Sequence, residues 1–135
     1  MTLPNGVMSW RCPLIAVVDD EASVRRAFAR MLSASMFHVE TYGSGREFLD
    51  SLQEHRPDCV LMDLQMPGLT GRDVQLELAI AHIRLPIIVV TAQDQPTVRE
   101  QCLADGAVAF VAKPLQREHL LRLIDDAIGA RTLAS

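Results

Sequence analysis

Hydrophobic residues along the chain gather in five short runs, separated by longer stretches of mixed character. The runs are LIAVV (14–18), FHVET (37–41), CVLMD (59–63), PIIVVT (86–91) and VAFVA (108–112). The first, third and fourth runs are almost continuous in valine, isoleucine and leucine, which is typical of strands buried on both faces of a parallel sheet. The pattern therefore predicts five strands, three of them inside the sheet.

The stretches between the runs have the periodicity of helices. Apolar side chains recur along one helical face in two of them: Val24, Phe28, Met31 and Leu32, then Leu120, Leu123, Ile124, Ala127 and Ile128. Ser44 stands three residues before Glu47 and Thr70 three before Asp73, the spacing of a capped helix start, and Pro96 follows Asp94. Five βα units in a row predict an α/β fold, a doubly wound five-stranded parallel sheet of flavodoxin-like order 2-1-3-4-5.

Length and composition narrow the class of protein. The chain has 135 residues, enough for one domain, which we place at residues 13–129 between an arm (1–12) and a short tail (130–135). Thirteen basic and seventeen acidic side chains leave a net charge of −4, which argues against direct contact with nucleic acid. No apolar run approaches the roughly 18 residues of a membrane helix, the first ten residues lack a signal segment, and the three cysteines are scattered. We expect a cytoplasmic protein without a membrane contact.

Polar side chains end four of the five predicted strands. Asp19 and Asp20 follow the first run, Asp63 ends the third, Thr91 ends the fourth and Lys113 follows the fifth. In a parallel α/β sheet, ligands bind beyond the carboxyl ends of the strands. Three carboxylates, a hydroxyl and an ammonium group are therefore expected to meet at one edge of the sheet.

This set of groups suits phosphoryl transfer. Clustered carboxylates repel one another unless a cation joins them, and Mg²⁺ is the ion that prefers one or two carboxylates together with phosphate oxygens. A remaining carboxylate can act as nucleophile and form an aspartyl phosphate, while Lys113 and the ion neutralise the transferring oxygens and Thr91 donates to one of them. Each residue alone fits a turn, a cap or a solvated charge; the combination at four strand ends indicates phosphoryl acceptance.

Four segments carry a family resemblance. VVDDE (17–21), LMDLQMPGLTG (61–71), VVTA (89–92) and FVAKP (110–114) resemble the receiver domain of two-component response regulators, in the same order and over about residues 14–129. The segment DQPTVREQCLADGAVAFVAKP (94–114) further resembles the FixJ-like subfamily, whose members usually carry a C-terminal DNA-binding domain. The resemblance implies a phosphorylation-dependent signalling switch that controls transcription through an output domain outside this chain.

The resemblance also implies a role for each matching residue of the metal and acceptor site. Asp63 would accept a phosphoryl group from the phosphohistidine of a sensor histidine kinase. Asp20 and Asp63 would ligate Mg²⁺ directly, Asp19 would act largely through water, and the backbone carbonyl of Gln65 would be a further ligand. The receiver would lose its phosphoryl group slowly, without being a turnover enzyme.

A second group of residues would bind the phosphoryl oxygens and respond to them. The resemblance implies that Thr91 and Lys113 bind the phosphoryl oxygens and that Phe110 is the switch aromatic. It also implies a cis peptide bond between Lys113 and Pro114. We expect Thr91 to move toward the phosphoryl group and Phe110 to fill the space it leaves. Homodimerisation would then use the fourth helix, fifth strand and fifth helix, where Val98, Cys102 and Val108 lie.

Three other functions remain as alternatives. A phosphatase of the haloacid-dehalogenase kind also uses an aspartyl nucleophile and Mg²⁺, but its second Asp would stand where this chain has Gln65. A flavodoxin-like FMN binder would want a phosphate loop where this chain has three acids. A receiver-like interaction module that does not use phosphate is the third alternative.

Met36 is an unusual residue at the joint between the first helix and the second strand. A left-handed glycine would be natural there, and a methionine with positive φ would cost roughly 1 kcal/mol more than glycine. The helix either ends without that motif or carries this cost; a residue substituted for an experiment is a further reading.

Overall fold

The computed structural model describes residues 12–92 and 94–134 as an alternation of strands and helices. The strands are β1 (Leu14–Val18), β2 (His38–Tyr42), β3 (Cys59–Met62), β4 (Ile87–Thr91) and β5 (Ala109–Ala112). The helices are α1 (Ala22–Ala34), α2 (Gly45–Ser51), α3 (Gly71–Ile80), α4 (Pro96–Ala104) and α5 (Arg117–Ala134). All five predicted strands are confirmed, each within one or two residues of its apolar run.

The strands form one parallel sheet in the order β2-β1-β3-β4-β5, which confirms the predicted α/β topology. Every residue of β3 and β4 is buried, as is all of β1 after Leu14, in agreement with their nearly continuous apolar sequences. Strand β2 lies at an edge and is only partly buried. The register pairs Val18 with Met62, so the residues that follow β1 and β3 are neighbours at the carboxyl end of the sheet.

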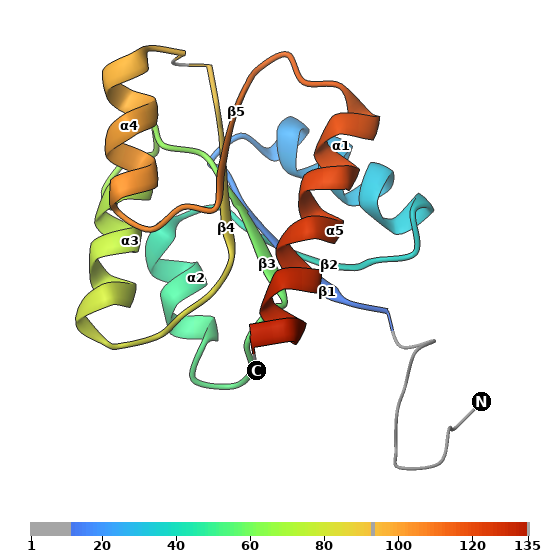
Figure 1. Ribbon diagram of the computed structural model, residues 1–135, viewed down its shortest axis with the longest axis horizontal. Coiled ribbons are helices and arrows are strands. Elements are labelled where there is room, and N and C mark those ends of the chain that lie inside the picture. Colours follow the sequence, from blue (N-terminus) through green and yellow to red (C-terminus); the bar gives the residue numbers. More distant parts are fainter. Residues whose placement is uncertain (1–11, 93, 135) are drawn as a thin grey trace.

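Helices cover both faces of the sheet and enclose two separate apolar cores. Helices α2, α3 and α4 pack on one face, and α1 and α5 on the other (Figure 1). Successive residues of a strand point to opposite faces, so Ile87 and Val89 of β4 enter the core beneath α2–α4, whereas Ile88 and Val90 enter the core beneath α1 and α5. This arrangement leaves the two ends of the sheet uncovered by helices.

The predicted helix starts are confirmed in atomic detail. Ser44 Oγ accepts a hydrogen bond from the Glu47 amide at 3.1 Å at the start of α2. At the start of α3, Thr70 Oγ1 accepts from the Asp73 amide and Asp73 Oδ2 accepts from the Thr70 amide, a complete capping box. Pro96 is the first residue of α4.

Helix α1 does end in a left-handed motif, without glycine. Met36 has φ of 72° and is 72% exposed. The amides of Met36 and Phe37 donate to the carbonyls of Ser33 and Leu32, the two hydrogen bonds of a Schellman motif. A methionine therefore carries the conformational cost that a glycine would avoid at this joint.

Helix α5 continues to Ala134, past residue 129 at which the sequence suggests the domain ends. Residues 1–11 of the expected arm lie outside the described residues. In the part of the chain that is described, no helix combines the length and apolar character needed to cross a bilayer.

Candidate functional site

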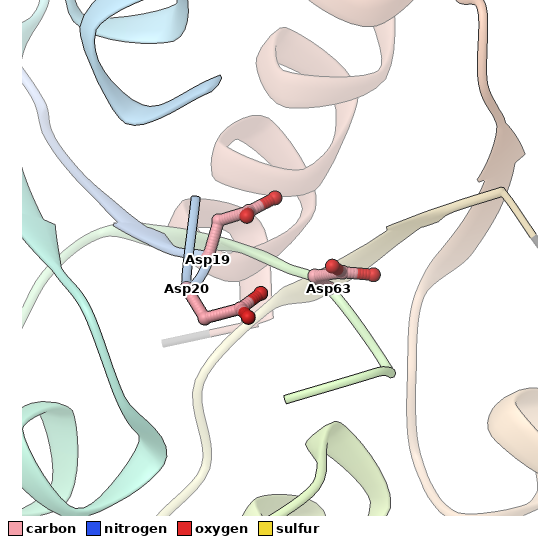
Figure 2. Close-up of side chains that lie close together, drawn as sticks. All are labelled: Asp19, Asp20 and Asp63. Carbon is pink, nitrogen blue, oxygen red and sulfur yellow. The ribbon is translucent and has the colours of Figure 1, made fainter. Parts of the chain in front are cut away.

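Three aspartates meet at the carboxyl end of the sheet. Asp19 and Asp20 follow β1 and Asp63 follows the neighbouring β3; one carboxylate oxygen from each lies within 4.8 Å of the others (Figure 2). Asp19 and Asp63 are buried, at 2% and 8% exposure, whereas Asp20 is exposed. The sequence prediction that these carboxylates converge is confirmed.

Backbone contacts hold Asp19 in place. Its amide donates to the Tyr42 carbonyl of β2, and its carboxylate Oδ1 accepts from the Glu21 amide at 2.9 Å as α1 begins. Arg25, one turn into α1, donates from Nη1 to the Asp19 carbonyl at 2.7 Å. The turn between β1 and α1 is thereby fixed by three contacts, and Arg25 is a supporting residue that the sequence pattern gave no reason to single out.

Asp63 occupies an electrostatically unfavourable position. Burial raises the pKa of its carboxyl group and the charge of Asp19 raises it further; Lys113 and the amides of Gln65 and Leu64 oppose the rise without cancelling it. Close packing fixes the backbone here, because a Cβ on Gly71 would lie 2.6 Å from the Asp63 carbonyl oxygen. A nearby cation would relieve the repulsion that the fold imposes on this carboxylate.

Lys113, the single lysine of the chain, supplies one such cation. Its amide donates to the Thr91 carbonyl at 2.8 Å, which ties the end of β5 to the end of β4. Its Nζ lies 3.2 Å from Asp19 Oδ2 and 4.0 Å from Asp63 Oδ2. The ammonium group thus lies between the two buried carboxylates, and the Lys113–Pro114 peptide bond is cis, as the resemblance implies.

The other predicted site residues differ in burial and position around this cluster. Thr91 ends β4 and is fully buried, whereas the side chain of Gln65 is exposed beyond Asp63. Phe110, on β5, is 6% exposed and belongs to the core beneath α2–α4. The guanidinium carbon of Arg99 on α4 lies 5.2 Å from the centroid of the Phe110 ring on the next element, β5, a contact that the sequence pattern did not indicate.

The donor set fits a hard divalent cation. All the candidate ligand atoms are oxygens, two of the three carboxylates are buried, and a single ammonium group faces them. Mg²⁺ prefers such oxygen ligands and retains several waters, which the exposed side of Asp20 leaves room for. Chemically, the cluster can hold a divalent cation beside a carboxylate nucleophile.

Two residues near the expected dimer face, Val98 and Cys102, lie partly or wholly in the core. Cys102 is 4% exposed and lies in the core beneath α2–α4, and Val98 is only partly exposed as it packs against that core. Cys102 is therefore buried, whereas Val98 keeps part of its side chain at the surface. The large apolar side chains that are exposed in this region are Leu103 and Val108, at 42% and 54%.

Comparison with known proteins identifies relatives over nearly the whole chain. The family model of the response regulator receiver domain matches residues 15–125. Nodulation protein W of Bradyrhizobium diazoefficiens is 34% identical over 119 residues, covering 88% of this chain and 51% of that protein. Response regulator MprA of Mycolicibacterium vanbaalenii is 41% identical over 107 residues, covering 79% of this chain and 46% of that protein. The chain spans about half the length of these relatives.

Solved structures agree with this assignment. A response regulator receiver protein from Burkholderia phymatum is 44% identical with a TM-score of 0.77, covering 87% of this chain and 95% of that one. The structure titled FixJ-N is 28% identical with a TM-score of 0.82, covering 88% of this chain and 95% of that one. Both sequence and fold are therefore similar to the same kind of protein.

Proposed function

The chain belongs to the response regulator receiver family, and on this premise we propose that Asp63 is its phosphoacceptor, with a sensor histidine kinase as donor. Receivers of this family act by phosphorylation on aspartate, and the relatives include transcriptional regulators such as NtrC of Klebsiella pneumoniae. One observation carries the proposal: Asp63 is buried beside Asp19 and Asp20, with Lys113 between the two buried carboxylates.

The proposed reaction is a direct transfer between side chains. A carboxylate oxygen of Asp63 attacks the phosphorus of the donor phosphohistidine; the P–O bond forms as the P–N bond breaks, and the electron pair returns to the imidazole. Asp63 must be ionised to attack. Burial raises the pKa of this carboxyl, so Lys113 and a bound cation favour the reactive form.

The proposed metal ligands are Asp20 and Asp63 directly, Asp19 largely through water, and the carbonyl of Gln65. Bound Mg²⁺ would neutralise charge on the transferring phosphoryl oxygens. The support for this set is the approach of three carboxylate oxygens to within 4.8 Å of one another. The amide of Glu21 and the ammonium group of Lys113 keep Asp19 oriented toward that point.

Lys113 and Thr91 are proposed to bind the phosphoryl oxygens after transfer. Lys113 Nζ is already 4.0 Å from Asp63 Oδ2, so a small movement away from Asp19 brings it to a group attached to Asp63. Thr91, at the end of the adjacent strand β4, would donate a hydrogen bond from its hydroxyl group to a second oxygen. Both residues would take up these roles once a phosphoryl group is attached to Asp63.

We further propose that the phosphorylated chain is a signalling element and forms a homodimer through α4, β5 and α5, with Leu103 and Val108 in the contact. It would not turn over a small substrate; hydrolysis of its own acyl phosphate would end the signal, in the cytoplasm. Sedimentation in Mg²⁺ and beryllofluoride tests the dimer. A chain that stays monomeric far above cellular concentration contradicts it, and Val108→Glu is the matched variant that should stay monomeric.

Intact mass after incubation with acetyl phosphate is the deciding experiment for phosphorylation. One phosphoryl adduct that needs Mg²⁺ and disappears in Asp63→Asn is the expected result. No adduct under any condition would favour the interaction module that does not use phosphate. Repeated turnover of a generic phosphate ester would favour the phosphatase, and Asp63→Asn would then abolish turnover as well.

A further inference from the structure

Arg99 lies over the aromatic ring at the centre of the proposed switch. Its guanidinium carbon is 5.2 Å from the centroid of Phe110, within the range of a cation–π contact. Arg99 itself is exposed, and it makes no ion pair with any carboxylate in residues 12–92 and 94–134. Its guanidinium is therefore available to cover the solvent side of a ring that is otherwise enclosed by the core.

The register of the sheet connects this ring to the phosphoryl site. Phe110 of β5 pairs with Val89 of β4, and Thr91 lies two residues further along β4. Residues two apart in a strand point to the same face, so Thr91 and Phe110 are diagonal neighbours on the face covered by α4. Any movement of the Thr91 side chain toward a phosphoryl group changes the space beside the Phe110 ring.

We propose that Arg99 is a positioning residue that holds Phe110 in its buried position and thereby raises the affinity of the aspartate cluster for a phosphoryl group. The inference rests on the proposed function of Asp63. Arg99 touches neither the aspartates nor the phosphoryl group; it acts through Phe110 and Thr91. It also fixes one side of α4 to β5, next to the exposed side chains of Leu103 and Val108.

The size of the effect follows from population arithmetic. Suppose that a phosphoryl mimic binds only when the Phe110 ring is buried. Its apparent affinity is then proportional to the fraction of molecules in which the ring is buried. An exposed cation–π contact corresponds to a two- to fivefold change in such a population, to order of magnitude. Removing the contact should weaken phosphoryl-group binding by about that factor.

The experiment measures binding of beryllofluoride with Mg²⁺, as a phosphoryl mimic, by NMR titration of the folded chain. Arg99→Gln should bind about two- to fivefold more weakly than the parent chain, and Arg99→Lys should recover part of the loss. Arg122→Gln, which removes the same charge from an exposed position on α5, should bind like the parent. Equal affinities of Arg99→Gln and Arg122→Gln would overturn the proposal.

Repeating the titration in a Phe110→Leu variant tells whether Arg99 acts through the ring or through a general effect on the structure. In Phe110→Leu the ring is absent, so adding Arg99→Gln should leave the affinity unchanged. The same loss in both backgrounds would overturn the proposal, because Arg99 would then act without the ring. Urea unfolding of each variant verifies that it is folded during the titration.

The failure of this inference can be told from failure of the proposed function. The ring of Phe110 should shift the δ-proton resonances of Arg99 upfield in the free chain, and Phe110→Leu should remove that shift. If the parent chain binds no beryllofluoride, the phosphoacceptor proposal fails and takes this inference with it. If the parent binds and Arg99 shows no ring-dependent shift, only the role of Arg99 is refuted.

Discussion

The two ends of the sheet contrast sharply in chemistry. At the carboxyl end, buried Asp19 and Asp63 lie within reach of the Lys113 ammonium group. At the amino end, a cavity of about 990 Å³ opens between α3, the start of β4 and α5, and most of its lining residues are apolar. In the described part of the chain, the one buried side-chain oxygen or nitrogen atom without a partner, Gln75 Oε1, is in a residue that lines this cavity. The charged groups therefore converge at the carboxyl end of the sheet, whereas the apolar cavity lies at the amino end.

Two residues at the amino end, Asp58 and Met36, have backbone roles. Asp58, just before β3, accepts a hydrogen bond at Oδ2 from the Leu14 amide at 2.8 Å and so pairs the beginnings of two strands. Met36 closes α1 before β2 at positive φ. The contrast teaches that the loops leading out of the strands hold the proposed acceptor site, whereas those leading into them hold backbone contacts.

Replacing one aspartate at each end gives the largest predicted difference. Asp63→Asn should abolish the phosphoryl adduct and yet raise the free energy of unfolding by roughly 1 kcal/mol without Mg²⁺, because the fold raises the pKa of Asp63 and so disfavours its charge. Asp58→Ala should retain the adduct and lower the free energy of unfolding by about 1–2 kcal/mol, since the Leu14 amide loses its acceptor. Mass spectrometry measures the adduct and urea unfolding measures the free energy of unfolding of each variant. A loss of stability in Asp63→Asn would contradict the predicted contrast between the two ends.

Lys113→Met should slow phosphorylation by about 100-fold, the usual cost of removing one charge-stabilising donor. The ammonium group lies between the buried carboxylates and is proposed to bind the phosphoryl oxygens. The rate of adduct formation from acetyl phosphate measures the effect. Arg122→Met, which removes an exposed cation from α5, is the control and should react like the parent. Comparable rates for Lys113→Met and the parent would remove Lys113 from the site.

Met36→Gly should raise the free energy of unfolding by about 1 kcal/mol, because glycine adopts positive φ without the steric cost that a methionine has. The side chain is 72% exposed, so its loss removes little packing. Urea unfolding measures the gain. Phosphorylation should not change, and a coupled change in adduct formation would show that the amino end also influences the acceptor site.

His55 is expected to make a pH-dependent contribution to the free energy of unfolding. Its Nε2 lies 2.6 Å from Glu40 Oε1. The hydrogen bond with Glu40 raises the pKa of His55; burial raises the pKa of Glu40, but its bonds to His55 and Tyr42 outweigh this and lower it. The stabilisation is therefore complete between the unfolded pKa of glutamate, about 4.3, and that of histidine, about 6.5. It is lost as pH rises through the raised pKa of His55 in the folded state, and as pH falls through the lowered pKa of Glu40.

His55→Gln tests this contribution. The variant should be less stable than the parent at pH 6, and the difference in unfolding free energy should shrink by pH 8.5. His119→Gln, on α5, serves as the control for general removal of a histidine. A difference that stays constant over this pH range would show that the ion pair contributes nothing.

Strand positions could be predicted because each apolar run is short, bounded by polar residues and rich in β-branched side chains. The same alternation predicted that Asp19, Asp63, Thr91 and Lys113 end strands, and parallel strands bring such ends together. The partial burial of Val98 could not be predicted, because a helix of nine residues presents several partly apolar faces and only packing selects the buried one.

The sequence by itself determined the elements, their order and the residue types at the carboxyl end of the sheet, because those depend on local pattern and on the few topologies that βα units allow. Tertiary structure alone decided which groups touch. The 3.2 Å contact of Lys113 with Asp19, residues 94 positions apart, and the stacking of Arg99 on Phe110 depend on rotamers and on how α4 and β5 pack. The whole fold sets the first contact, and the packing of two successive elements sets the second, so the pattern of apolar and polar residues carries no signal for either.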